Sequence, residues 1–147
     1  MARSDFQFST RVRVRYAEID AQAVVFNSRY LEYADVAVTE YWRTTGLSVH
    51  PDWKAMEFHV ARALIEYKAP IRYDEEIDLY ARTTRIGRSS LTTSIEIHGV
   101  LAAPQEDLRA EIEIINVHVD LETGKSCRLP DWLGTTLDAF DRGAPLS

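Results

Sequence analysis

An aspartate stands between two segments of different periodicity near the start of the chain. Before it, Val12, Val14 and Tyr16 alternate with arginines, the period of two expected of a half-buried strand. After it, apolar residues recur at helical spacing until Gly46, which is placed to end a helix. A carboxylate between such elements lies near backbone N–H groups without an intrahelical partner, where negative charge and polarised carbonyl oxygens are favoured. The pattern therefore predicts chemistry on a carbonyl group at Asp20.

A second carboxylate competes for this role. Glu18 and Asp20 are two residues apart, so an extended backbone places both side chains on one side, and either could face a cleft. An aspartate before a helix is also a common cap, as are Asn27 and Ser28. The residues alone leave these roles open.

The elements that must position these groups can be read from periodicity. A helix is predicted over roughly 28–45, and strands over 6–16, 58–67, 77–83, 91–97 and 108–119. A change of parity in the last strand predicts a bulge near Ile114 and Ile115. One helix followed by a run of strands indicates an α+β fold with an antiparallel sheet.

Composition narrows the classes of function. The 147 residues are the usual size of one domain, and we expect a single domain over 1–147. The net charge of -6 argues against nucleic-acid binding. One cysteine, Cys127, cannot form an internal disulfide, and neither a membrane-spanning run nor a signal-peptide pattern is visible, so we expect no membrane partner and a cytoplasmic location. His118 and Asp120 share a strand face without a further ligand cluster, so no metal site is expected.

Three stretches together resemble a known family. D-A-Q-A-V-V-F-N-S-R-Y at 20–30, I-E-Y-K-A-P-I-R-Y-D-E-E-I at 65–77 and V-H-V-D-L-E-T-G-K-S-C-R-L-P-D-W-L at 117–133 look like the hotdog-fold acyl-CoA thioesterases of the 4-hydroxybenzoyl-CoA thioesterase type, which include the YbgC-like enzymes. The resemblance implies a five-stranded antiparallel sheet wrapped around one long central helix, in a homodimer or homotetramer. It also implies hydrolysis of an acyl-CoA or aroyl-CoA to free acid and CoA, with no cofactor and with active sites between subunits.

The same resemblance assigns roles around the helix start. Asp20 matches the family's catalytic aspartate and would act as a general base on water or as a nucleophile. Backbone amides around Phe26 and Asn27 would polarise the thioester carbonyl, and a partner subunit's Glu66 would face the site. From its residue type alone, Tyr30 is a further candidate for a substrate contact on the pocket wall. The sequence departs from the family where Ala23 replaces a usual glycine and where a frequent histidine before the helix is absent, with Asn27 nearby.

Binding of CoA is expected at the turn between the third and fourth strands. In related thioesterases this hairpin contacts the nucleotide, which implies roles for Arg85, Arg88 and Ser89, and the planar guanidinium of arginine suits phosphate. A solvated turn is the alternative for this segment. For the whole protein the alternative is a non-catalytic acyl-CoA or acyl-ligand binding protein of the same fold. A hydratase or dehydratase is disfavoured because no histidine motif precedes the helix. Acyl length, and CoA versus a carrier protein, stay open.

Overall fold

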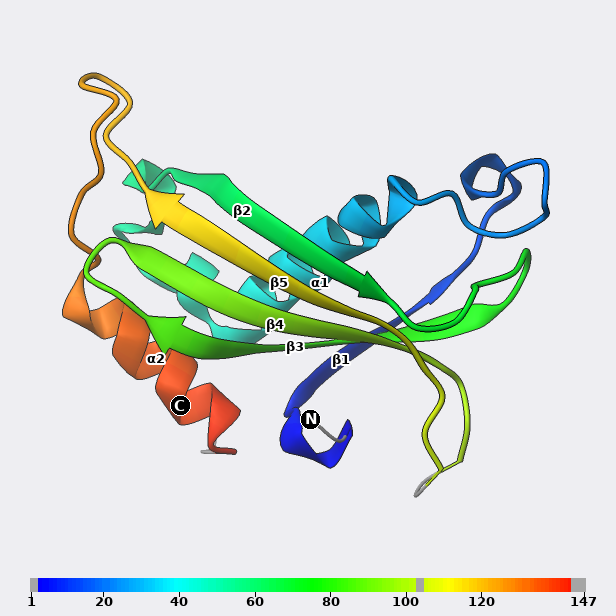
Figure 1. Ribbon diagram of the computed structural model, residues 1–147. Helices are drawn as coiled ribbons and strands as arrows, with labels where there is room; N and C mark the ends of the chain where they lie inside the picture. Colours follow the sequence, from blue (N-terminus) through cyan, green and yellow to red (C-terminus); the bar gives the residue numbers. More distant parts are fainter. Residues whose placement is uncertain (1–2, 103–104, 144–147) are drawn as a thin grey trace.

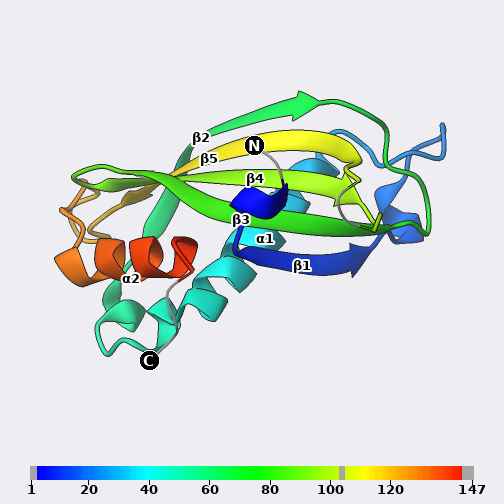
Figure 2. The same ribbon diagram turned by 90° about the horizontal axis from the view of Figure 1, so that it is seen from below.

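Five antiparallel strands form one sheet that carries two helices on the same side (Figures 1 and 2). The computed structural model describes residues 3–102 and 105–143. The strand order across the sheet is β1-β3-β4-β5-β2. The elements are β1 (Phe8–Arg13), α1 (Arg29–Thr45), β2 (Phe58–Tyr67), β3 (Glu76–Ile86), β4 (Ser90–Gly99), β5 (Leu108–His118) and α2 (Asp131–Asp141). The expected five-stranded antiparallel sheet with a helix before its second strand is confirmed.

Helix α1 packs along the sheet because one of its faces is apolar and partly small. Ala34 and Ala37 are 1% and 0% exposed, so their short side chains allow the helix to approach the strands closely. Tyr41 fills the adjoining space and is fully buried. The helix has 17 residues and ends where Gly46 takes a φ of 92°, a left-handed conformation that glycine adopts without strain. This packing fixes the position of the helix start relative to the strands.

Two details differ from the sequence expectation. The predicted bulge in β5 is wrong, because Ile112, Ile114 and Asn116 keep one alternating buried face through that strand. The register shifts lie elsewhere, between Val60 and Arg62 in β2, between Thr83 and Arg85 in β3, and between Ile97 and His98 in the pairing of β4 with β5. Helix α2 was not expected from the sequence, and it packs through Leu133 and Leu137, both fully buried.

Strand β2 is the exposed edge of the sheet. It pairs with β5 alone among the described strands, and most of its residues are exposed on both faces. Val60, Leu64 and Tyr67 are 55%, 42% and 50% exposed. An unpaired edge with apolar side chains is a ready template for pairing with another strand.

Candidate active site

The segment between β1 and α1, blue on the right of Figure 1, contains a tight turn. Asp20 begins this turn. Its N–H donates to the Val24 carbonyl at 2.9 Å, and its own carbonyl accepts from the Ala23 N–H at 3.0 Å. The Gln22 N–H donates to Asp20 Oδ1 at 2.8 Å. The half-buried carboxylate therefore has one oxygen engaged, while Oδ2 accepts no hydrogen bond from the described residues.

The turn depends on an unusual backbone conformation at Ala23. Its φ is 63°, in the left-handed region. Glycine adopts this conformation without strain, whereas for alanine it costs about 1 kcal/mol of conformational free energy. The family's usual glycine at this position is thus replaced without loss of the turn. The alanine stores local strain next to the candidate catalytic residue.

Glu18 is the buried member of the carboxylate pair, only 5% exposed. Its Oε1 accepts from the Arg15 N–H at 2.8 Å and from the Tyr33 hydroxyl at 2.9 Å, while Oε2 accepts from the Arg15 guanidinium at 3.1 Å. Burial alone would raise the pKa of Glu18, but these donors outweigh it and hold the pKa below its ordinary value. Every oxygen of Glu18 therefore accepts a hydrogen bond from the chain itself, whereas Oδ2 of Asp20 has no donor in the described part of the chain.

The start of α1 offers free backbone donors. The Phe26 N–H is occupied, since it donates to the Glu18 carbonyl at 3.0 Å. The N–H groups of Asn27 and Ser28 donate to no acceptor within the described part of the chain. Ser28 occupies the cap position but its side chain makes no capping hydrogen bond, so the expected cap is absent. Two unpaired donors at the positive end of a helix form a site for a carbonyl oxygen or an anion.

Strand β2 brings Tyr67, rather than Glu66, to this helix start. The Tyr67 hydroxyl donates to the Asn27 carbonyl at 3.0 Å, and its ring packs edge-on against Tyr30 at 4.8 Å between centroids. Glu66 pairs across the sheet with Glu111, on the face opposite α1, and bonds to Lys68 at 3.1 Å. Tyr30 itself is 3% exposed within this chain. Neighbouring residues of a strand face opposite sides of the sheet. The sequence alone therefore indicates that Tyr67 and Glu66 lie on different faces of β2.

The turn between β3 and β4 lies at the other end of the sheet and is tied to the segment before α2. The Arg88 and Ser89 carbonyls accept from the Leu129 and His118 N–H groups, each at 2.8 Å. Arg88 and Arg128 line one open hollow of about 690 Å³. The Arg88 guanidinium makes no ion pair with the described residues, and Arg128 reaches Asp131 at 3.5 Å. Sequence reasoning missed Arg128, although it stands in the stretch that carries the resemblance.

Arg85 does not share that hollow. It lines a smaller one of about 250 Å³ with Arg82, Asp138 and Arg142 at the end of α2. The three expected CoA contacts are thus divided, with Arg88 and Ser89 at the turn and Arg85 facing elsewhere. The charge available for a phosphate group at the turn comes from Arg88 and Arg128.

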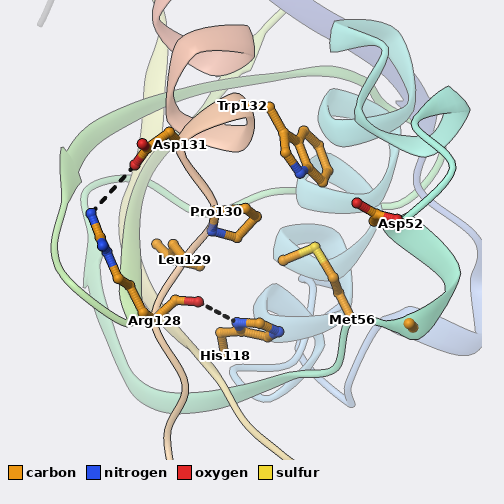
Figure 3. A pocket seen from close by; sticks show the side chains of 9 residues that line it. Asp52, Met56, His118, Arg128, Leu129, Pro130, Asp131 and Trp132 are labelled. Atoms are coloured by element: carbon orange, nitrogen blue, oxygen red, sulfur yellow. Dashed lines mark hydrogen bonds and ion pairs between the residues drawn. The ribbon is translucent and has the colours of Figure 1, made fainter.

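A third hollow, of about 560 Å³, shares residues 128–131 with the hollow at Arg88 (Figure 3). Met56, Leu129 and Trp132 give it apolar walls, and His118 lies at its edge, with its Nδ1 3.3 Å from the Arg128 carbonyl. The Trp132 ring stacks on His50 at 3.7 Å between centroids, which holds one wall in place. An apolar hollow beside a basic one suits a ligand with a phosphorylated head and a less polar arm.

A single chain does not bring Asp20 and Arg88 together. The Asp20 turn meets the residues before β3 through the Val24 and Arg72 bridge, whereas Arg88 follows the end of β3. The 11 residues of β3 span about 35 Å, so the two groups stand at opposite ends of the sheet (Figure 1). Within residues 3–102 and 105–143, no cluster of three potential metal ligands occurs. No helix in those same ranges is long and apolar enough to cross a membrane.

Comparisons with known proteins agree with this geometry. A family model described as the thioesterase-like superfamily matches residues 14–137. The acyl-CoA thioester hydrolase YbgC of Escherichia coli is 29% identical over 124 residues, which cover 84% of this chain and 90% of that protein.

Solved structures of thioesterases share the fold of this chain. A thioesterase from Thermus thermophilus, complexed with coenzyme A and zinc, superposes with a TM-score of 0.78 at 26% identity, covering 96% of this chain and 98% of that one. A 1,4-dihydroxy-2-naphthoyl-CoA thioesterase from Synechocystis shares the fold with a TM-score of 0.78 at 20% identity, over 91% and 97% of the two chains. The chain therefore belongs to the thioesterase-like superfamily, and it is a thioester hydrolase of the hotdog fold.

Proposed function

We propose that this protein hydrolyses an acyl-CoA or aroyl-CoA thioester to the free carboxylic acid and CoA, with Asp20 as the catalytic carboxylate. One observation carries the proposal. Among residues 3–102 and 105–143, nothing donates to Oδ2 of Asp20 and nothing accepts from the N–H groups of Asn27 and Ser28, to which the Asp20 turn leads. The CoA bound to the Thermus thermophilus relative and the name of the Escherichia coli relative support CoA as the leaving group.

The proposed reaction uses few groups. The N–H groups of Asn27 and Ser28 donate hydrogen bonds to the carbonyl oxygen of the thioester and stabilise the negative charge that develops on it. Asp20 either takes a proton from a water molecule that attacks the carbonyl carbon, or attacks that carbon itself to form a mixed anhydride that water then cleaves. In both routes the carbon–sulfur bond breaks and CoA leaves as the thiolate, which gains a proton.

We further propose that a homodimer, alone or as half of a tetramer, completes the site. Antiparallel pairing of two β2 edges about a two-fold axis would place the Phe58 end of one strand beside the Tyr67 end of the other. Tyr67 touches Asn27, and Phe58 pairs with His118 at the edge of the apolar hollow. The pairing would therefore bring the Asp20 turn of one subunit to the hollows at Arg128 and Trp132 of its partner.

The CoA would then lie across the two subunits. Its phosphates would pair with Arg88 and Arg128 of one chain, with Ser89 at the same turn. Its pantetheine arm would run through the apolar hollow beside Trp132, towards the other subunit's Asp20. Arg85 and Glu66 lie apart from this path, so their predicted contacts rest on the family resemblance alone. The cytoplasmic location also stays a prediction.

Asp20→Asn tests the catalytic proposal. The amide keeps the shape of the side chain and the bond from the Gln22 N–H but lacks basicity and nucleophilicity, so kcat on CoA esters should fall by about a hundredfold or more. Release of free thiol from a panel of CoA esters measures the rate. Asp74→Asn is the matched control, because Asp74 is an exposed turn aspartate at a φ of 65°, a conformation that asparagine tolerates.

Two results would contradict the proposal in different ways. If Asp20→Asn kept near wild-type turnover, the catalytic group would be another residue. If the wild-type protein bound CoA esters but released no thiol from any of them, the chain would be a binding protein of the same fold.

A further inference from the structure

We propose that Tyr33 is a positioning residue for Asp20, acting through the buried carboxylate of Glu18. The inference rests on the proposed function, because it assigns to Tyr33 a role in the turnover that Asp20 carries out. Tyr33 itself is 4% exposed and touches no substrate in this account. Its hydroxyl donates the one side-chain hydrogen bond that links Glu18 to α1 in the part of the chain that the structure describes.

The Asp20 turn is the tip of a small hairpin. The Phe26 N–H donates to the Glu18 carbonyl, residues Ile19 and Val25 form a bridge, and the Asp20 N–H donates to the Val24 carbonyl. Glu18 stands at the base of this hairpin, directly opposite the residue that precedes the free donors at Asn27 and Ser28. A shift of Glu18 would therefore move the Asp20 carboxylate relative to those donors.

Tyr33 ties the base of the hairpin to the rigid part of the molecule. It lies one turn into α1, packs beside Tyr30 and donates to Glu18 Oε1 at 2.9 Å. Burial and the adjacent carboxylate raise the pKa of the Tyr33 hydroxyl, so the group stays a donor at every pH of interest. The other side-chain donor, Arg15, is 74% exposed and extends to the solvent side of the carboxylate. Of these two side-chain donors, Tyr33 is the one that connects Glu18 to α1, the helix that begins after Asn27 and Ser28.

The two oxygens of Glu18 have separable tasks. Oε1 receives the Arg15 N–H and the Tyr33 hydroxyl, whereas Oε2 receives only the guanidinium of Arg15. Glu18→Gln can keep an oxygen at the first position, while its amide N–H groups replace the oxygen that pairs with the Arg15 guanidinium, so the ion pair is lost. Tyr33→Phe removes the link to α1 while leaving the ring and the carboxylate in place. If Tyr33 positions Asp20, the Tyr33→Phe variant should lose more turnover than the Glu18→Gln variant.

A double-mutant cycle tests the inference on the intact protein, with Tyr33→Phe, Asp20→Asn and the double variant assayed on one CoA ester. Tyr33→Phe should lower kcat about tenfold with KM within about twofold, since misplacement of a reacting group affects the chemical step. In the Asp20→Asn background the same change should alter the residual rate by less than about twofold, because no positioned carboxylate remains. Glu18→Gln should keep kcat within about threefold of wild type.

Tyr41→Phe is the matched control. Tyr41 is also a buried α1 tyrosine, and its hydroxyl donates to Asp141 at 2.6 Å, far from the Asp20 hairpin. It should lower the melting temperature without lowering kcat.

Each outcome decides between accounts. Wild-type kcat in Tyr33→Phe, or an equal loss with and without Asp20, would overturn the positioning role and leave the proposed function standing. Loss of turnover in Glu18→Gln would make Glu18 itself catalytic and would also overturn it. Near wild-type turnover in Asp20→Asn would instead overturn the proposed function.

Discussion

The two ends of the sheet differ in how their polar groups are satisfied. At the Asp20 end, Glu18 and Phe26 are hydrogen-bonded within the chain, whereas one Asp20 oxygen and the N–H groups of Asn27 and Ser28 have no partner in the described ranges. At the other end, Arg88 lines an open hollow without a charged partner among the described residues. The first end holds groups for chemistry on a carbonyl, and the second holds a cation for phosphate.

This difference supports the proposal that each end supplies half of a site shared between two subunits. A strand length of about 35 Å separates them within one chain, whereas antiparallel pairing across the exposed β2 edge would place the complementary halves side by side. Three changes test this difference between the ends. They disrupt pairing at the β2 edge, remove the arginines at the end that holds Arg88, and change the backbone of the Asp20 turn.

Breaking the β2 edge should have the largest effect. Val60→Glu combined with Leu64→Glu places like charges on both faces of a strand that would pair with its own copy. Light scattering should report a change from a dimer or tetramer mass to a monomer mass, and turnover of CoA esters should fall by about a hundredfold or more, because no complete site remains. Val49→Glu, at a residue that is 84% exposed and away from the edge, should change neither. A monomer that kept its activity would refute the site between subunits.

Removing the phosphate end should have a smaller and selective effect. Arg88→Ala with Arg128→Ala should raise KM for CoA esters about tenfold or more and leave short thioesters without a nucleotide nearly unaffected, because only the former present phosphate. The ratio of kcat/KM between the two substrate classes is the measurement. Arg85→Ala is the control at the same hairpin, since Arg85 faces a different hollow. Equal loss on both classes would indicate a folding defect instead.

The smallest effect is expected from the backbone of the Asp20 turn. Ala23→Gly should remove the strain of a positive φ and stabilise the protein by up to about 1 kcal/mol, reduced by the greater freedom of glycine when unfolded. Ala55→Gly, at an exposed position without a positive φ, should destabilise the protein by a similar amount. Thermal unfolding of the two variants should therefore shift in opposite directions. A loss of stability in Ala23→Gly would contradict the strain at this turn.

The sequence predicted the positions of helices and strands better than which face of a strand packs against the helix. The strand over 58–67 and the helix over 28–45 follow from periodicity, and both agree with the structure within one residue. Periodicity says which residues share a face but not which face meets the helix, so the contact between Tyr67 and Asn27 was not predicted. The predicted role of Glu66 in a partner subunit's site came from the family resemblance and stays a prediction. The bulge was placed in β5 because partly buried Ile115 and Val117 on its outer face resemble a change of parity.

The candidate site was predicted in part, for a physical reason. Glu18 and Asp20 could not be ranked from their spacing, because the donor that separates them is the hydroxyl of Tyr33, 15 residues from Glu18. Helix α2 was missed because Gly134 and two threonines lower its helix propensity, although Leu133 and Leu137 have helical spacing. Arg128 lies beside Arg88 because the segment before α2 packs against the turn between β3 and β4, a tertiary contact that sequence spacing does not indicate.

Complementation between two defective chains tests the central claim most directly. One chain carries Asp20→Asn, and the other carries Arg88→Ala and Arg128→Ala. The two are co-expressed with different affinity tags, and the mixed dimer is purified on both. If each site takes Asp20 from one subunit and the arginines from the other, one of the two sites in this dimer is intact, so kcat/KM on a CoA ester should reach about half the wild-type value. An activity no higher than the mean of the two defective homodimers would show that Asp20 and the arginines serve the same chain, and would contradict the account.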